Sequence, residues 1–523
     1  MASQGSNNHM KGSSEVKLEQ GDSSNSINTH IFTLDETFKA TYDHVVYSAL
    51  TEEAVKEKLI QFADNAADEL YKMASSGSPL WQLDDLKEEI LDNAVYQNMF
   101  MSNMRYREEL QGVQIMQGAD PIMITPTHPM IIEASRSSGN IHKKPLELIS
   151  MFMDVEQWME MFPNIVSSAR IIGKILDDGN DHDGSLTVMK AEFGFPTPYP
   201  TTRECYFIRR SKQVNEHCWL IVDVSLDLPG LKYYRKPSGC LIEQVDDSCS
   251  KIIWVEHNEI SLEGCFPVLF KELVSSGFVF LAGDVERSNL LKLLAHRMSQ
   301  ICMKKMNAST KKIWNSRKSI ENDGYVFANT EFFENNLGRP NGKYIITVAA
   351  SLQLPFDADK LYDSLQCVEC RPKWDISMLG AAAKEEMRIT FEHDPSAYVS
   401  VLNVKVPGIE PMKCLQACFL NSISMYMIWT VLNTKTMNAI MQGGVDPDTI
   451  EILVSGAAVL PWHPTIEDGG SVLTLAFESL DETEDSAAEQ VRQDALYSVI
   501  TKTLTMGIIT CTPPFESNHG SSQ

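Results

Sequence analysis

The closest pair of cysteines in the sequence, Cys367 and Cys370, has the CxxC spacing of half a zinc site or of a dithiol redox motif. A tetrahedral zinc site also requires a second such pair or two histidines at suitable spacing, and the sequence offers neither. The residues around Cys367 do not resemble a thioredoxin-like unit either. We therefore predict that this spacing is coincidental.

Other polar residues fit no catalytic arrangement. Glu256 and His257 are adjacent in a strand-like segment, so their side chains should point to opposite faces and cannot act as a joint acid–base or metal-ligating pair. Gly443-Gly444 and Gly469-Gly470 are typical of turns, and neither is followed by the Lys-Ser/Thr of a phosphate-binding loop. No Ser/His/Asp or Cys/His constellation stands out. These patterns favour a protein that is not an enzyme and that needs no metal or cofactor.

The composition limits the class of protein further. The chain has 523 residues, of which 43% are hydrophobic, and its 11 cysteines have no regular spacing. This length favours two or three domains, and the irregular cysteines favour free thiols in the nucleus or cytoplasm. The net charge of −25 argues against binding of duplex DNA by this chain alone. No run reaches the roughly 18 apolar residues of a membrane-spanning helix, so no transmembrane segment is predicted.

The elements that would position functional side chains include a clear hairpin. The segments 240–245 and 251–257 can alternate faces on either side of the polar turn Asp246-Asp247-Ser248. Four strand-like segments precede it: 169–176, 185–193, 203–212 and 218–226. An antiparallel sheet is therefore predicted. The amphipathic segment from Asn289 to Met306 is predicted to be the helix that closes this first domain.

The second half of the chain repeats this order of elements. It contains an early helix followed by a tryptophan, at least six strands, and a closing helix from about Ser486 to Thr505. We therefore predict an α+β protein with an internal duplication, each domain being a curved antiparallel sheet packed on a long C-terminal helix. The predicted limits are a disordered arm at 1–50, a first domain at 51–312, a linker at 313–342, a second domain at 343–512 and a disordered tail at 513–523.

From about Asp64 to Glu516 the sequence resembles plant class IV homeodomain-leucine zipper transcription factors. In the first half the resemblance rests on the hairpin region from Arg235 to His257 and on MDVEQWMEMFPNIV at 153–166, and in the second half on MQGG at 441–444. It implies a START (StAR-related lipid transfer) domain, a helix-grip fold that encloses one sterol, phospholipid or ceramide-like molecule. A START-adjacent domain, which we expect to have a START-like helix-grip fold as well, follows it.

The resemblance also implies which residues bind the lipid. START cavities have an acid–arginine pair at the floor, and Glu192 with Arg209 are the candidates for it, although Arg203 with Glu204 could equally supply the pair. The alternative, in which these residues do not bind a ligand, is that they are exposed strand residues or an ordinary salt bridge. Trp219 and Trp254 are candidate walls of the cavity, or else core aromatics that need no ligand.

The function implied is that of a lipid- or sterol-binding regulatory protein, nuclear by resemblance, that acts in transcriptional regulation. We expect no direct DNA binding, because the polar N-terminal arm of about 60 residues contains no basic recognition helix. The segment 277–287 is shorter than its counterpart in the family, so the helix at 289–306 would itself be the lid, or the cavity would lack one. Two alternatives remain: an interaction module that dimerises with or interferes with full-length relatives, its cavity being vestigial, and an intracellular lipid-transfer carrier.

Overall fold

The structure is a computed structural model. It describes residues 52–83, 89–100, 130–162, 165–176, 184–197, 203–226, 233–261, 289–307, 315–318, 325–334, 344–375, 381–391, 396–405, 408, 410–420, 424–462 and 470–481. The N-terminal arm, the segment 277–287, the helix predicted at 486–505 and the C-terminal tail lie outside these residues. Among the residues described, no helix has the length and apolar character needed to cross a membrane.

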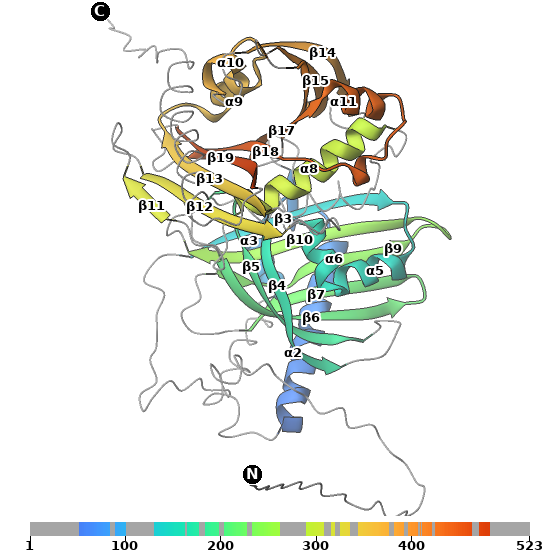
Figure 1. Ribbon diagram of the computed structural model, residues 1–523. Helices are drawn as coiled ribbons and strands as arrows, with labels where there is room; N and C mark the ends of the chain where they lie inside the picture. The colour runs from blue at the N-terminus through green and yellow to red at the C-terminus, as the bar shows by residue number, and fades with distance from the viewer. Residues whose placement is uncertain are drawn as a thin grey trace, which may run out of the picture.

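Two large antiparallel sheets form the framework of the protein (Figure 1). The strands of the first sheet are β1 (Trp81–Leu83), β2 (Glu89–Leu91), β3 (Met130–Ile141), β4 (Val166–Leu176), β5 (Leu186–Phe193), β6 (Arg203–Asn215), β7 (Cys218–Ser225), β8 (Tyr233–Arg235), β9 (Ser238–Gln244) and β10 (Ser250–Ser261). Their order is β1-β2-β3-β10-β9-β7-β6-β5-β4, and β8 pairs with β10. The predicted hairpin is thus β9 and β10, which lie in the middle of the sheet.

The second sheet has the same topology. Its strands are β11 (Asn315–Lys318), β12 (Tyr325–Glu334), β13 (Tyr344–Leu354), β14 (Ala382–Thr390), β15 (Tyr398–Lys405), β16 (Met412–Leu420), β17 (Met425–Asn433), β18 (Ser455–Trp462) and β19 (Gly470–Asp481). Their order is β11-β12-β13-β19-β18-β17-β16-β15-β14. In each sheet an early strand pairs with the last one, and the strands between them run back antiparallel. This common order confirms the α+β fold with two sheet domains.

Helices cover both faces of each sheet. In the first domain, α2 (Glu52–Ser75) packs on β6, β7, β9 and β10, and α3 (Asn93–Phe100) adds Tyr96 and Phe100 to the same apolar cluster. The opposite face carries α5 (Pro145–Met153) and α6 (Val155–Met161). Asp154 separates these two helices because its side chain accepts hydrogen bonds from the backbone N–H groups of Glu156 and Gln157, which caps α6. Strands between these layers are buried on both sides, as in β7, where every residue is buried.

The second domain has the equivalent short helices, α9 (Ala358–Gln366) and α10 (Arg371–Trp374), directly after β13. They pack on one face of the second sheet, with Trp374 against Trp429 of β17 at 5.9 Å between ring centroids. The helix α11 (Thr434–Met441) and the short 3-10 helix η3 (Pro447–Thr449) lie between β17 and β18 in the chain. The duplication therefore extends from the strands to the helices that follow the first long strand.

The amphipathic helix predicted to close the first domain is α8 (Leu290–Met306), and it packs on the second sheet instead. It contacts β13 and β15 to β19, together with α11 and η3, and Figure 1 shows it in yellow-green beside α11. Its position in the chain, ahead of β11 to β13, corresponds to that of α2 ahead of β1 to β3. The predicted assignment was wrong because an apolar stripe indicates that a helix face is buried, but not which sheet buries it.

Two close contacts fix α8 on the second sheet. Gly456 of β18 lies directly under Cys302 of α8, so that a Cβ atom at this glycine would overlap the Cys302 sulfur. At the end of the helix, Lys305 forms an ion pair with Glu478 of β19, and their side chains are 9% and 1% exposed. The predicted linker differs as well, since β11 and β12 fall within 313–342 and belong to the second sheet.

The two domains meet through buried hydroxyl groups. Thr197, which follows β5, has its Oγ1 atom 3.0 Å from the Oγ atom of Ser351 in β13. The same Ser351 Oγ atom lies 2.9 Å from Oγ1 of Thr474 in β19. All three residues are fully buried. One apolar cluster also includes residues of both domains, so the α5 and α6 side of the first sheet and the α8 side of the second belong to a common interior.

Candidate functional site

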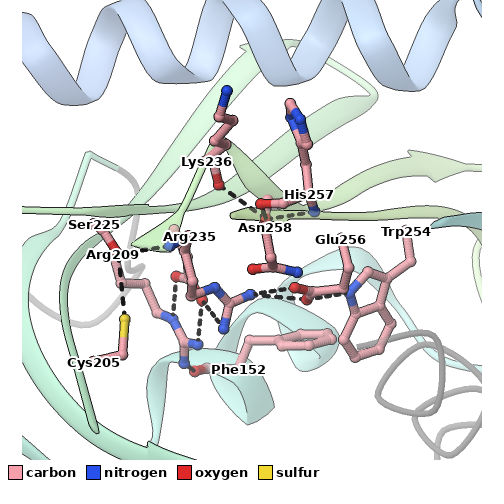
Figure 2. A network of polar contacts seen from close by, with 12 residues as sticks. Phe152, Cys205, Arg209, Ser225, Arg235, Lys236, Trp254, Glu256, His257 and Asn258 are labelled. Carbon is pink, nitrogen blue, oxygen red and sulfur yellow. Dashed lines mark hydrogen bonds and ion pairs between the residues drawn. The ribbon is translucent and has the colours of Figure 1, made fainter. Parts of the chain in front are cut away.

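Four strands of the first sheet each contribute one charged side chain to a common buried network. These residues are Arg209 of β6, Asp223 of β7, Arg235 of β8 and Glu256 of β10. Arg209 and Asp223 lie directly opposite each other in the register of β6 and β7, so their side chains share a face. Arg235 lies opposite Asn258, two residues from Glu256, and therefore reaches the same face. Figure 2 shows the side chains of Arg209, Arg235 and Glu256 converging.

The network consists of two ion pairs joined by a longer contact. Arg209 binds Asp223 through both sides of its guanidinium, with Nε 2.7 Å from Oδ1 and Nη2 2.8 Å from Oδ2. The Nη2 atom of Arg235 lies 2.8 Å from each carboxylate oxygen of Glu256. Its Nη1 atom is 3.6 Å from Oδ2 of Asp223, which links the pairs. Two guanidinium groups thus balance two carboxylates, as burial of charge requires.

Neighbouring groups hold this arrangement in place. The backbone carbonyl of Phe152 in α5 accepts a hydrogen bond of 2.6 Å from Nη1 of Arg209, and the indole of Trp158 in α6 lies 4.4 Å from its guanidinium carbon. The indole N–H of Trp254 donates to Oε1 of Glu256 at 3.1 Å. The site is therefore built where α5 and α6 cover the sheet.

Burial determines the electrostatics of the network, since each of the four residues is at most 3% exposed. Desolvation disfavours the charged form of Arg235, yet Glu256 and Asp223 outweigh it and hold the pKa of Arg235 above its ordinary value. The nearby Cys205 is affected in a different way, because burial raises the pKa of its thiol to about 12. Arg235 therefore stays charged, and Cys205 stays a neutral thiol at neutral pH.

One member of the network has hydrogen-bonding capacity to spare. The Nε and Nη1 atoms of Arg235 have no hydrogen-bond acceptor among the residues that the structure describes. Its Nη2 atom and its backbone N–H are satisfied, the latter by a 2.7 Å hydrogen bond to Oγ of Ser225. A buried donor of this kind is stabilised by any oxygen that reaches it. Arg235 can thus anchor an oxygen of a ligand enclosed on this face.

The structure brings some of the predicted site residues together and separates others. Arg209 is part of the network, but its carboxylate partner is Asp223 and not Glu192. In the register of β5 and β6, Arg209 lies opposite Thr187, an odd number of residues from Glu192, so Glu192 points to the other face. Glu192 instead lies opposite Glu204. The predicted Glu192–Arg209 pair is therefore wrong.

Three other candidates, Arg203, Trp219 and Trp254, lie on the network face. Trp254 binds the network directly, and Trp219 lies four residues before Asp223 on β7, which places both tryptophans on that side of the sheet. Arg203 lies at the start of β6 with its guanidinium carbon 5.6 Å from the ring of Phe195. The alternative pair is excluded in the same way, since Arg203 and Glu204 are adjacent on β6 and point to opposite faces.

Sequence reasoning missed Asp223, Arg235 and Glu256. A signal was present for two of them, because a single carboxylate interrupts otherwise apolar strands in CWLIVDVS and IIWVEH. Such a charge must be paired if the strand is buried on both faces. Among the described residues no group of three or more His, Cys, Asp or Glu side chains is arranged to hold a metal ion.

The opposite face of β10 carries an isolated histidine. His257, labelled in Figure 2, is fully buried. Its ring lies edge-on to that of Tyr96 of α3, at 4.7 Å between centroids. Neither ring nitrogen has a hydrogen-bond partner among the described residues. Burial, together with the nearby charge of Lys236, lowers the pKa of His257 well below its ordinary value. A buried carboxylate on this side, that of Glu69, accepts a hydrogen bond from Tyr96.

This histidine makes stability depend on pH. Because its pKa in the folded state lies below that in the unfolded state, the neutral ring contributes stability above about pH 6.5, and this is lost as the pH falls. Between pH 6.5 and 5.5 the free energy of unfolding should decrease by about 1 kcal/mol from this residue alone. Urea unfolding at both pH values should show this loss, and the variant His257→Phe should show a flatter dependence. Equal slopes for the two proteins would contradict the assignment.

Comparisons with known proteins agree with this architecture. Residues 61–289 match the family model of the START domain, and residues 284–508 match that of the PDF2-like, C-terminal domain. The junction between the two matches precedes α8, as the packing of that helix on the second sheet requires.

Similar proteins from Arabidopsis thaliana include three homeobox-leucine zipper proteins. HDG3 is 29% identical over 390 residues (67% of this chain and 53% of that protein), HDG12 is 27% identical over 464 residues (81% and 64%), and GLABRA 2 is 27% identical over 500 residues (85% and 64%). The chain thus spans between half and two thirds of the length of these relatives.

Two solved structures are also similar. Human StAR-related lipid transfer protein 5 is 15% identical and covers 36% of this chain and 98% of its own, with a TM-score of 0.23. The di-domain ARO/CYC StfQ from the steffimycin biosynthetic pathway is 11% identical and covers 72% of this chain and 96% of its own, with a TM-score of 0.22. The chain thus carries a START domain followed by a PDF2-like C-terminal domain, and over most of its length it is similar to plant homeobox-leucine zipper proteins.

Proposed function

We propose that this protein is a lipid- or sterol-binding START-domain regulator that acts in transcriptional regulation in the nucleus without binding DNA itself. The observation that carries the proposal is Arg235, which is buried in a charge-balanced network and has two guanidinium nitrogens, Nε and Nη1, without a hydrogen-bond acceptor among the described residues. The net charge of −25 supports the absence of direct DNA binding. In this proposal the protein is not an enzyme, and the ligand acts by binding alone.

Binding would combine an apolar and a polar contribution. The apolar part of the lipid leaves water against aromatic side chains on the network face, Trp219 and Trp254 among them, with a gain of about 25 cal/mol per Å² of apolar surface buried. A hydroxyl, carbonyl or phosphate oxygen accepts hydrogen bonds from Arg235, and Arg203 is a second donor near the start of β6. The apolar part supplies most of the affinity, while the arginine fixes the orientation.

Thermal and urea unfolding of the purified chain with added sterol, phosphatidylcholine or ceramide tests the proposal. A ligand that binds only the folded protein raises the free energy of unfolding by about 1.4 kcal/mol at a free concentration ten times its Kd. Native mass spectrometry should also find a lipid that co-purifies. The absence of any shift and of any bound lipid would refute lipid binding.

The variant Arg235→Lys tests the polar anchor separately. It keeps the positive charge but removes the guanidinium donors, so a correctly folded variant should need a higher concentration of the same lipid for the same shift. An unchanged response would leave lipid binding in place and assign the anchor to another residue. The variant Lys251→Gln, at a half-exposed ion pair with Glu243, serves as the matched control.

A second function is favoured by the aromatic side chains that pack closely against the charged network. Arg209 and Arg235 lie against the rings of Trp158, Phe193 and Phe207, and all these residues are buried. A filled START interior of this kind fits an interaction module that dimerises with, or interferes with, full-length homeodomain-leucine zipper relatives. Capture of a purified relative by the chain, unaffected by Arg235→Lys and by removal of lipid, would favour this function over lipid binding.

A further inference from the structure

The turn between α9 and α10 brings two thiols together. Cys367 is the C-cap residue of α9 and Cys370 the N-cap residue of α10. The backbone N–H groups of Cys370 and Arg371 both donate to the carbonyl of Cys367 at 3.1 Å, which closes the turn. The two Sγ atoms lie 2.7 Å apart, so the sulfurs are in direct contact.

The elements on both sides keep this pair in place. α9 packs on β17, β18 and β19, and its residues Leu361 and Leu365 are fully buried. After the turn, Arg371 is 1% exposed, forms an ion pair with Asp375 and lies 4.6 Å from the ring of Trp429. The contact between the thiols is therefore set by the packing of the second domain and does not depend on a free loop.

Exposure distinguishes this pair from the other described cysteines. Cys367 and Cys370 are both partly exposed, whereas the remaining seven are buried: Cys205, Cys218, Cys240, Cys249, Cys302, Cys414 and Cys418. Burial raises the pKa of the Cys414 thiol to about 11 and that of Cys302 to about 12, which keeps these thiols protonated and unreactive. Among the nine described cysteines, an oxidant in solution should therefore react first with the pair in the turn between α9 and α10.

We propose that Cys367 and Cys370 are a redox modification site that forms a reversible intramolecular disulfide with a hydroperoxide as oxidant. The thiolate of one cysteine attacks a peroxide oxygen, the O–O bond breaks, and a sulfenic acid and one water are formed when the oxidant is hydrogen peroxide. The second thiolate attacks the sulfenic sulfur, the S–O bond breaks and a second water leaves. In total, two thiols lose two hydrogen atoms and one peroxide is reduced to two waters.

The spacing of the pair suits this reaction better than metal binding. Two sulfurs in contact already lie on the path to a bond of about 2.05 Å, and the partner thiol is close enough to trap the sulfenic acid before further oxidation. Glu369 stands between the two cysteines in the sequence. One of its carboxylate oxygens, Oε2, lies 3.7 Å from Sγ of Cys367. The sequence spacing alone predicts that the CxxC motif is coincidental, but the contact between its two sulfurs fits disulfide formation.

Stepwise oxidation of the reduced, full-length chain with hydrogen peroxide tests the site. After native blocking of free thiols and digestion with trypsin, residues 361–373 should form one peptide with both cysteines, since Pro372 prevents cleavage after Arg371. We expect this peptide to lose two hydrogens and to resist alkylation at lower peroxide concentrations than any peptide with a buried cysteine. Dithiothreitol should reverse the change.

The variant Cys370→Ser provides the second arm of the experiment. In it, Cys367 should proceed to the sulfinic or sulfonic acid or form a mixed disulfide with added glutathione, while circular dichroism confirms the fold. The variant Cys414→Ser should leave disulfide formation unchanged. Single oxidation of either cysteine in the native chain without a link, or simultaneous oxidation of the buried thiols, would overturn the proposal.

Discussion

Replacement of Asp223 by asparagine is expected to lower the free energy of unfolding by about 3–5 kcal/mol. The substitution keeps the shape of the side chain but removes the negative charge that Arg209 binds at 2.7 and 2.8 Å and that Arg235 contacts at 3.6 Å. Two buried guanidinium groups would then face the single carboxylate of Glu256. Urea unfolding of the full chain, followed by tryptophan fluorescence and circular dichroism, measures the loss.

The control is an ion pair on the same sheet that water can reach. Lys251 and Glu243 are 3.4 Å apart, and their side chains are 44% and 42% exposed. Glu243→Gln should therefore change the free energy of unfolding by less than about 1 kcal/mol. If Asp223→Asn were no more destabilising than this control, the buried network would not be an essential part of the first domain.

Replacement of Lys305 by methionine should destabilise the protein by about 3 kcal/mol. The side chain of Glu478 is 1% exposed, and its carboxylate would lose its cationic partner. The hydrogen bond that it accepts from the backbone N–H of Val454 would remain. The measurement is the free energy of unfolding from urea titrations at neutral pH. This prediction tests whether α8 belongs to the second sheet, because Lys305 meets Glu478 only in that packing.

The neighbouring residue gives a matched control. Lys304 is exposed in the same turn of α8, so Lys304→Met should cost less than about 1 kcal/mol. The double variant Lys305→Met with Glu478→Leu removes both charges and should recover most of the stability. A loss at Lys305 equal to that at Lys304, or no recovery in the double variant, would be evidence against the docking of α8 on β19.

The fold was largely predictable because strand alternation and the Asp246 to Ser248 turn are local signals, and the family resemblance placed them in a START domain. The position of α8 was not predictable from the sequence, since the pattern of Leu291, Leu294 and Met298 fits either sheet equally well. Its contacts with Gly456 and Glu478 involve residues more than 150 positions away. Only tertiary packing decides between the two.

The site was predictable in part for a related reason. Arg209, a candidate for the acid–arginine pair, is buried in the structure, but its carboxylate partner depends on the register of three strands. A shift of one residue reverses the face of every side chain in a strand, so Glu192 could not be distinguished from Asp223 without the pairing of β5, β6 and β7. Arg235 comes from the three-residue strand β8, which carries too short a pattern to be recognised.

The hydroxyl chain of Thr197, Ser351 and Thr474 affects how these two domains can evolve. Each hydroxyl is shielded from water and uses its neighbour as a hydrogen-bond partner, so replacing one domain alone removes one hydrogen-bond partner from a buried hydroxyl of the other. A START domain transplanted from a distant relative would have to bring a threonine or serine to the place of Thr197. The two domains are therefore best inherited, exchanged and engineered as a single unit.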